Sequence, residues 1–237
     1  MTSKGQGRSS EREFEYHADL GLLNRINYAL SRRVRRKMFD LFMHEFRPTP
    51  ESRVGDLGVT ANQGTPVHYF FETLYPWKEK LTAVGREEAY WYPEKFAGMK
   101  YINADLRSIP LPDGYFDAAI CNAVVEHTGV REQQARLIHE VCRVSKCVMV
   151  TTPNAGFPVD PHTFVPFAHW LPERYYRAVL RTLGRGAFAD IEVLNPLRAS
   201  EFVILFPPSR KNRLIKVGFP LLPTNLVCIS SSHSLSL

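Results

Sequence analysis

The 237-residue sequence contains only four cysteines and no apolar run long enough to cross a lipid bilayer. The cysteines, Cys121, Cys142, Cys147 and Cys228, lack the paired spacing of a zinc site. We therefore expect buried thiols in a reducing compartment, with neither disulfides nor zinc. The first ten residues also lack the apolar core of a signal peptide. These absences predict a cytoplasmic protein.

The glycine-rich sequence G-x-G-x-x-G is also absent, which removes the main support for a site that binds NAD or FAD. Apolar residues make up 44% of the chain and aromatic residues 12%, which is enough to build the core of one large domain. The net charge is +6, and part of the excess forms one basic cluster of Arg32, Arg33, Arg35, Arg36 and Lys37. Such a cluster suits phosphates or an anionic membrane surface, and it also suits a solvated helix face.

Segments with strand and helix patterns alternate along most of the chain. Apolar residues recur at helical spacing from Leu20 to Phe46. We then predict strands at 53–57, 81–84, 100–103, 116–121 and 146–152, and helices near 62–75, 87–96 and 131–142. A further helix at 173–183 and two closing strands at 214–217 and 225–229 follow. This alternation predicts a parallel sheet with right-handed crossovers.

The same pattern predicts how the chain is divided. Residues 1–15 are polar and are expected to form a disordered tail. Residues 16–50 should form a helical segment, and residues 51–237 should form the main domain. An insert at about 154–212 should lie on the side where an acceptor substrate binds.

Polar side chains follow successive predicted strands. Asp56, Asp105 and Asn122 each lie at or just after the end of a strand. Ligands of open parallel sheets bind in the crevice at the carboxyl ends of the strands. These side chains are therefore expected to converge on one nucleoside-binding site.

Four short motifs occur in a characteristic order: Asp56-Leu57-Gly58, Ala104-Asp105-Leu106, Phe116-Asp117 and Glu126-His127. With them, residues 50–155 resemble the class I methyltransferases that use S-adenosylmethionine. The segment from Pro158 to Pro172 is similar to one found in a bacterial subset of these enzymes. The resemblance implies an α/β, Rossmann-like, doubly wound sheet of seven strands. That sheet is mostly parallel, with an antiparallel strand near the C-terminus and helices on both faces.

The resemblance also implies which residues hold the methionine and ribose parts of the cofactor. Asp56 should lie beneath the methionine part or order the turn that follows. Gly58 should let the backbone approach the ligand, whereas Thr60 stands where the family usually has glycine. Gly85 stands where the family carries the acid that binds the ribose hydroxyls. Glu87 then becomes the candidate for that contact, although a glutamate beside a helix N-terminus also has an ordinary explanation.

Three further residues complete the cofactor set that the resemblance implies. Asp105 should accept a hydrogen bond from the adenine amino group, with the backbone of Leu106 nearby. A helix N-cap is the alternative for Asp105. Asn122 should lie close to the transferred methyl group.

The candidates for a catalytic base are His127, His162 and His169, although a lone histidine often has a structural role. Related enzymes that bind a divalent metal carry a glutamate three residues before the Glu-His pair, where this sequence has Ala123. Glu126, His127 and His139 are then an incomplete set of ligands. The sequence therefore predicts no catalytic metal.

The leading hypothesis is an S-adenosylmethionine-dependent methyltransferase that acts on a small molecule or glycan, most plausibly at oxygen. Aromatic residues of the insert, Phe157, Phe164, Phe167 and Trp170, either stack on that acceptor or belong to the core. An RNA methyltransferase is one alternative, supported by the basic cluster, which also makes peripheral contact with a membrane conceivable. A methyltransferase-like scaffold without activity is another, because Thr60 and Gly85 depart from the family pattern.

Overall fold

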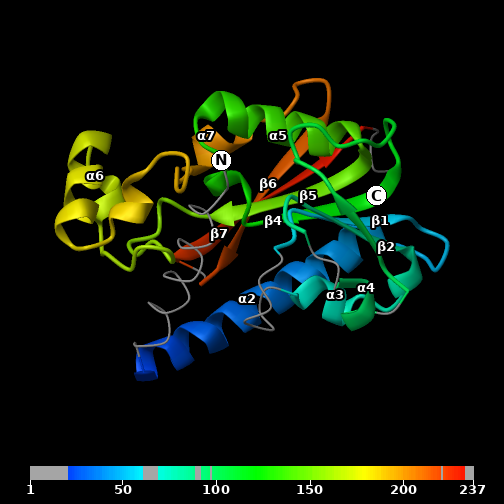
Figure 1. Ribbon diagram of the computed structural model, residues 1–237, viewed down its shortest axis with the longest axis horizontal. Coiled ribbons are helices and arrows are strands. Elements are labelled where there is room, and N and C mark those ends of the chain that lie inside the picture. Colours follow the sequence, from blue (N-terminus) through cyan, green and yellow to red (C-terminus); the bar gives the residue numbers. More distant parts are fainter. Residues whose placement is uncertain (1–20, 61–68, 89–91, 97, 220, 233–237) are drawn as a thin grey trace, which may run out of the picture.

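The computed structural model contains one seven-stranded sheet (Figure 1) and describes residues 21–60, 69–88, 92–96, 98–219 and 221–232. The strands are β1 (Val54–Leu57), β2 (Leu81–Gly85), β3 (Lys100–Asn103), β4 (Phe116–Asn122), β5 (Ser145–Pro153), β6 (Lys211–Gly218) and β7 (Pro223–Ser231). Their order is β3-β2-β1-β4-β5-β7-β6. All neighbours are parallel except β7, which is antiparallel to both β5 and β6. The predicted fold class is confirmed, and the strand order reverses between β1 and β4, where ligands of such sheets bind.

Helices cover both faces of the sheet (Figure 1). On one face lie α2 (Gly21–Phe46), α3 (Phe70–Leu74) and α4 (Tyr92–Lys95). On the other lie α5 (Arg131–Arg143) and α7 (Ala199–Val203). The described part of the chain contains no helix long and apolar enough to cross a membrane.

The helix predicted at 131–142 is confirmed, but the one predicted at 87–96 is wrong at its start. The structure gives a bend at Glu87, a non-helical Glu88, and a helix only at Tyr92–Lys95. Half of the helix predicted at 62–75, residues 62–68, lies outside the described residues, and its second half contains α3. The tail predicted at 1–15 also lies outside them. The insert between β5 and β6 contains η3 (Ala168–Trp170), α6 (Glu173–Thr182) and η4 (Gly186–Ala189), followed by α7.

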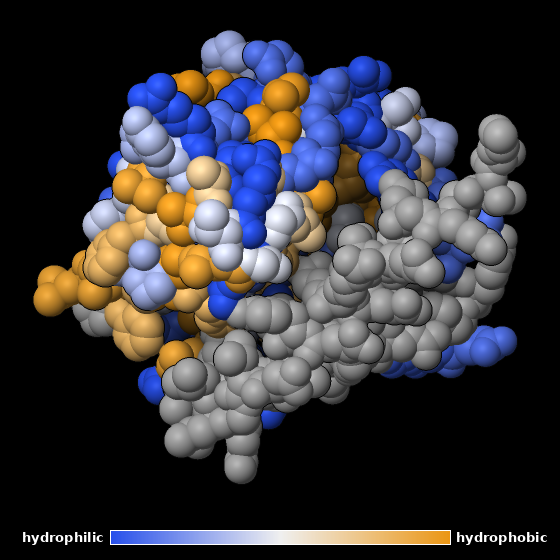
Figure 2. All heavy atoms as spheres, turned by 60° about the vertical axis from the view of Figure 1, so that its left-hand side comes forward, coloured by the Kyte–Doolittle hydropathy of each residue, from blue (hydrophilic) through white to orange (hydrophobic). Residues whose placement is uncertain are grey.

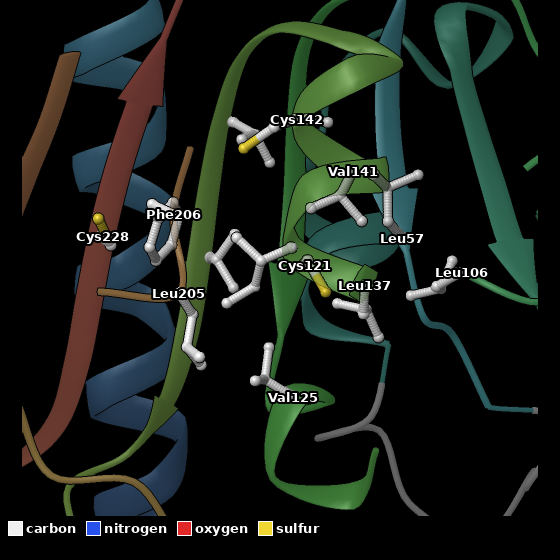
Figure 3. Packing of buried hydrophobic residues seen from close by; sticks show 14 of the residues in the cluster. Leu57, Leu106, Cys121, Val125, Leu137, Val141, Cys142, Leu205, Phe206 and Cys228 are labelled. Atoms are coloured by element: carbon white, nitrogen blue, oxygen red, sulfur yellow. The ribbon is translucent and has the colours of Figure 1, made fainter. Parts of the chain in front are cut away.

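The apolar stripe of α5 packs on the sheet and fixes one face of the core (Figure 3). Its residues Leu137, Val141 and Cys142 are at most 2% exposed. They lie over residues from several strands, including Leu57 of β1 and Cys121 of β4. This packing fixes β1 and β4, which flank the point where the strand order reverses.

Candidate functional site

The chain turns sharply after β1 at Gly58. Its φ angle is +98°, and a Cβ atom at this position would lie 2.4 Å from Cγ2 of Val124. The amides of Gly58 and Val59 both donate to the carbonyl of Val84, at 2.7 and 3.1 Å. The turn is therefore folded onto the end of β2, and only glycine fits at position 58.

Gly85, which ends β2, lies directly against that turn. A Cβ atom at Gly85 would lie 2.5 Å from the Val59 carbonyl oxygen and 2.8 Å from the Tyr101 hydroxyl. No side chain fits there, so this backbone arrangement excludes an acidic residue at position 85. Glu87 follows two residues later, and its Oε2 accepts a hydrogen bond from Thr60 Oγ1 at 3.2 Å. The structure thus brings together the predicted residues Thr60 and Glu87.

Asp56 points to the face of the sheet covered by α3, where it interacts with the carboxyl group of Glu72. Asp56 is 8% exposed and Glu72 is 0% exposed. Burial raises the pKa of Asp56 to about 7, against the opposing effect of its hydrogen bond with Glu72. Burial and then the charge of Asp56 raise the pKa of Glu72 well above its usual range. The two carboxyl groups therefore share a proton near neutral pH.

Sequence analysis missed Glu72. The available signal was a single acidic residue in a short helix that begins with two phenylalanines. Acidic residues are almost never fully buried unless they are paired.

Asp105 lies in a turn and is held by Arg107. Arg107 donates from Nη2 to Oδ2 at 2.6 Å, and from Nε and its backbone amide to Oδ1, each at 2.9 Å. Chiefly because of the side-chain hydrogen bonds from Arg107, the pKa of Asp105 is lowered to about 2. No helix begins at residues 98–115, so the alternative of a helix N-cap is wrong. Leu106 is buried beside Gly58, and the contacts of both residues with adenine stay a prediction.

The end of β4 leads directly into the short helix η2 (Val125–His127). Asn122 accepts a hydrogen bond from Thr151 Oγ1 at 2.7 Å. Glu126 is only 1% exposed, and its Oε2 accepts from Thr152 Oγ1 at 2.9 Å. Its Oε1 has no hydrogen-bond partner among the residues that the structure describes.

Two of the three predicted histidines meet, although they lie far apart in the sequence. Nε2 of His127 is 3.0 Å from Nε2 of His162. Nδ1 of His127 is 2.7 Å from the carbonyl oxygen of Val193, and Nδ1 of His162 is 3.6 Å from Oδ2 of Asp160. One ligand atom from each of Glu126, His127 and His162 lies within 4.8 Å of the other two. We call these three residues the Glu-His-His cluster.

His169 does not belong to this cluster. Its Nε2 lies instead 2.9 Å from the carbonyl oxygen of Phe157. Sequence analysis also missed Asp160 and Thr152, which hold members of the cluster in place. The sequence offered one signal for Asp160, its position two residues before His162. Nothing in the sequence indicated that either residue lies close to Glu126, which belongs to η2.

The aromatic residues Phe167 and Trp170 of the insert face solvent and do not belong to the core. They are 53% and 42% exposed, and their ring centroids are 4.9 Å apart. Trp170 Nε1 donates to the carbonyl of Ala155, which lies two residues after β5, at 2.9 Å. Figure 2 turns the α6 side of the molecule forward and shows hydrophobic residues gathered on part of this face.

Comparisons with known proteins agree with this fold. Residues 76–147 match the model of a family described as a methyltransferase domain. Magnesium protoporphyrin IX methyltransferase from Synechocystis, solved with bound S-adenosylhomocysteine, is 10% identical, with a TM-score of 0.56 and 94% of each chain covered. A protein from Pyrococcus horikoshii is 16% identical, with a TM-score of 0.55, and the match covers 84% of this chain and 90% of that one.

A third solved structure is the 1,6-didemethyltoxoflavin N1-methyltransferase of Burkholderia thailandensis. It is 9% identical, with a TM-score of 0.55, and the match covers 97% of this chain and 91% of that one. A search of the curated proteins finds no match. At these identities the solved structures show the shared fold, and the family model covers β2 to the start of β5. Residues 76–147 thus match a methyltransferase domain family, and the whole chain has the fold of solved S-adenosylmethionine-dependent methyltransferases.

Proposed function

We propose that this protein transfers a methyl group from S-adenosylmethionine to a hydroxyl group of a small molecule or glycan. The observation that carries the proposal is the arrangement at the carboxyl edge of the sheet. Thr60 and Glu87 meet beside the β1 turn, and the Glu-His-His cluster follows the end of β4. Cofactor and acceptor sites are thus built from strands on the two sides of the switch point.

The residues beside β1 and β2 fit the cofactor. A carboxylate accepts two hydrogen bonds in a fixed fork, so Glu87 suits the two ribose hydroxyls. The buried pair of Asp56 and Glu72 suits a cationic ligand nearby, because a positive charge would stabilise the ionised forms of both adjacent carboxyl groups. When bound, the cofactor supplies a methyl group on a positively charged sulfur atom.

The Glu-His-His cluster supports transfer to oxygen. A neutral hydroxyl group is a weak nucleophile, so its proton must be removed as the new bond to carbon forms. The acceptor oxygen then gains the methyl group, and its proton passes to His127 of the cluster. Transfer to an unprotonated nitrogen would need alignment alone and would leave the Glu-His-His cluster without a role.

The exposed pair of Phe167 and Trp170 supports an acceptor with a flat or sugar-like face. Aromatic rings held at an angle offer an apolar surface for such a ring, and both side chains belong to the insert that also supplies His162. Loops at this edge commonly determine substrate specificity. The glycan class is therefore favoured within the proposal.

The test is the formation of S-adenosylhomocysteine from S-adenosylmethionine in the presence of a panel of sugars, glycosides and phenols. We expect turnover with at least one hydroxyl acceptor, and a loss of about 100-fold or more in His127→Ala. Glu88→Gln is the control, because Glu88 is exposed and lies outside both residue sets. Turnover that is unchanged in His127→Ala would contradict the assignment to oxygen.

The other partners predicted from the sequence have weaker support. Within the basic cluster, Arg36 forms an ion pair with Asp40 at 2.9 Å, and Arg35 donates to Ser31. Part of the cluster is thus engaged on its own helix, as expected for a solvated helix face. RNA binding, peripheral membrane contact and a cytoplasmic location stay predictions.

A further inference from the structure

We propose that Glu126, His127 and His162 bind a divalent transition-metal ion. The sequence predicts no metal because Ala123 stands where related metal-binding enzymes carry a glutamate. In the structure a different residue, His162 from the insert, supplies the third ligand atom. The inference rests on the proposed function for the role of the ion, and on the geometry of the cluster for its binding.

The contacts of the two histidines at Nδ1 leave both Nε2 atoms available, 3.0 Å from each other. A carbonyl oxygen only accepts, so the contact with Val193 O at 2.7 Å places a proton on Nδ1 of His127. The Asp160 carboxylate, 3.6 Å from Nδ1 of His162, favours a proton there as well. Both Nε2 atoms then present lone pairs, and they lie 3.0 Å apart. Histidines that bind metals have this arrangement, with the second ring nitrogen donating to a carbonyl or carboxylate.

Two lone pairs at this distance repel each other unless a cation lies between or beside them. A proton shared by the two rings would satisfy the histidines, but it would leave Oε1 of Glu126 without a partner in a side chain that is 1% exposed. A metal ion satisfies all three groups. It also balances the negative charges of Glu126 and of Asp160, which is 5% exposed. A bound metal ion therefore explains the positions of all three ligand atoms, whereas a shared proton explains only those of the two histidine nitrogens.

The ligand set indicates the kind of ion. Imidazole nitrogen suits zinc and iron better than magnesium or calcium, and two histidines with one carboxylate form a recurrent catalytic set. Two nitrogens bound to one ion at about 2.1 Å lie about 3.0 to 3.4 Å apart, close to the distance found here. Three protein ligands leave coordination positions open. An acceptor hydroxyl bound at such a position would lose its proton more readily.

The experiment begins with protein dialysed against a chelator and titrated with Zn²⁺ in a calorimeter. We expect one site of micromolar or tighter affinity, weakened about 100-fold or more in His162→Ala and in Glu126→Gln. His139→Ala is the matched control, because His139 is exposed on α5 outside the cluster, and its affinity should equal that of the wild type. Binding that is absent in the wild type, or equal in all four proteins, would overturn the proposal.

A second experiment looks for a new absorption band, because a variant that fails to fold cannot produce one. His162→Cys keeps a ligand at this position, and a thiolate bound to Co²⁺ adds charge-transfer absorption that imidazole does not give. We expect this absorption in His162→Cys and not in His139→Cys. Its absence from folded, Co²⁺-treated His162→Cys would count against His162 as a ligand. Titration of the same chelator-treated protein with S-adenosylhomocysteine tests the proposed function separately, because its site consists of other residues.

Discussion

Gly85 lies where a backbone carbonyl and a hydroxyl group leave no room for any side chain. The Val59 carbonyl oxygen and the Tyr101 hydroxyl together occupy the space that a Cβ atom would take. The nearest acid, Glu87, is held beside Thr60. The close packing at Gly85 therefore excludes a carboxylate at that position, and Glu87 carries the nearest one, two residues later.

The structure predicts that Gly85→Ala is destabilising. The added methyl group would overlap backbone atoms that cannot move freely, at a cost of about 1 to 3 kcal/mol in the free energy of unfolding. Denaturant-induced unfolding measures this difference. The control is Gly186→Ala, where nothing lies within 4 Å of the new Cβ atom. Equal stabilities of the two variants would show that the Val59 carbonyl does not pack against Gly85 as closely as the structure indicates.

The junction of β4 and η2 positions two residues of the Glu-His-His cluster. Ala123 joins them with a φ of +54°, a left-handed conformation that L-residues other than glycine seldom adopt. This sharp turn carries the chain from the sheet into η2, where Glu126 and His127 lie. Strained residues of this kind occur preferentially at functional sites.

The effect of a substitution at Ala123 on the stability of the fold should therefore depend on how well the new residue adopts a positive φ angle. Ala123→Gly is expected to stabilise the fold by up to about 1 kcal/mol, because glycine adopts this conformation without cost. Ala123→Val is expected to destabilise it, because a β-branched side chain is poorly tolerated at positive φ. Thermal unfolding of both variants measures the effect. A stabilised Ala123→Val would contradict the left-handed turn.

The elements that sequence patterns predicted well are those with clear periodicity. The α5 stripe and the strands β1 and β4 were placed correctly, because burial on one helix face or on both sheet faces leaves a strong apolar signal. The Glu-His-His cluster was predicted only in part. His162 was named as a candidate base, but its contact with His127 joins residues 35 positions apart. No periodicity records such a contact, and the same is true of the pairing of Asp56 with Glu72.

For the whole molecule, the buried pair of Asp56 and Glu72 links stability to pH. The pKa of Asp56 in the fold is about 7 against an ordinary value of 3.8, and that of Glu72 is raised as well. The folded state therefore holds a proton that the unfolded chain has released. The stabilisation is fully present below the unfolded pKa and is lost as the pH rises through about 7.

We predict that the free energy of unfolding of the wild type falls between pH 5 and pH 7.5, with each unit of pKa shift worth about 1.4 kcal/mol. Glu72→Gln should show a smaller fall, because it removes one of the two groups that titrate in this range. Urea unfolding across this range measures both slopes. Glu79→Gln, which alters an exposed carboxylate, should behave like the wild type. Parallel pH dependence of Glu72→Gln and the wild type would refute the pairing.

Calorimetric titration with S-adenosylmethionine and S-adenosylhomocysteine tests the central claim, a cofactor site at the ends of β1 and β2. Wild type and Glu88→Gln should bind S-adenosylhomocysteine with micromolar affinity. Glu87→Gln should bind about tenfold or more weakly, because it loses hydrogen bonds to a charged group. Absence of binding by the wild type at millimolar ligand would contradict the claim and favour a methyltransferase fold used only as a scaffold.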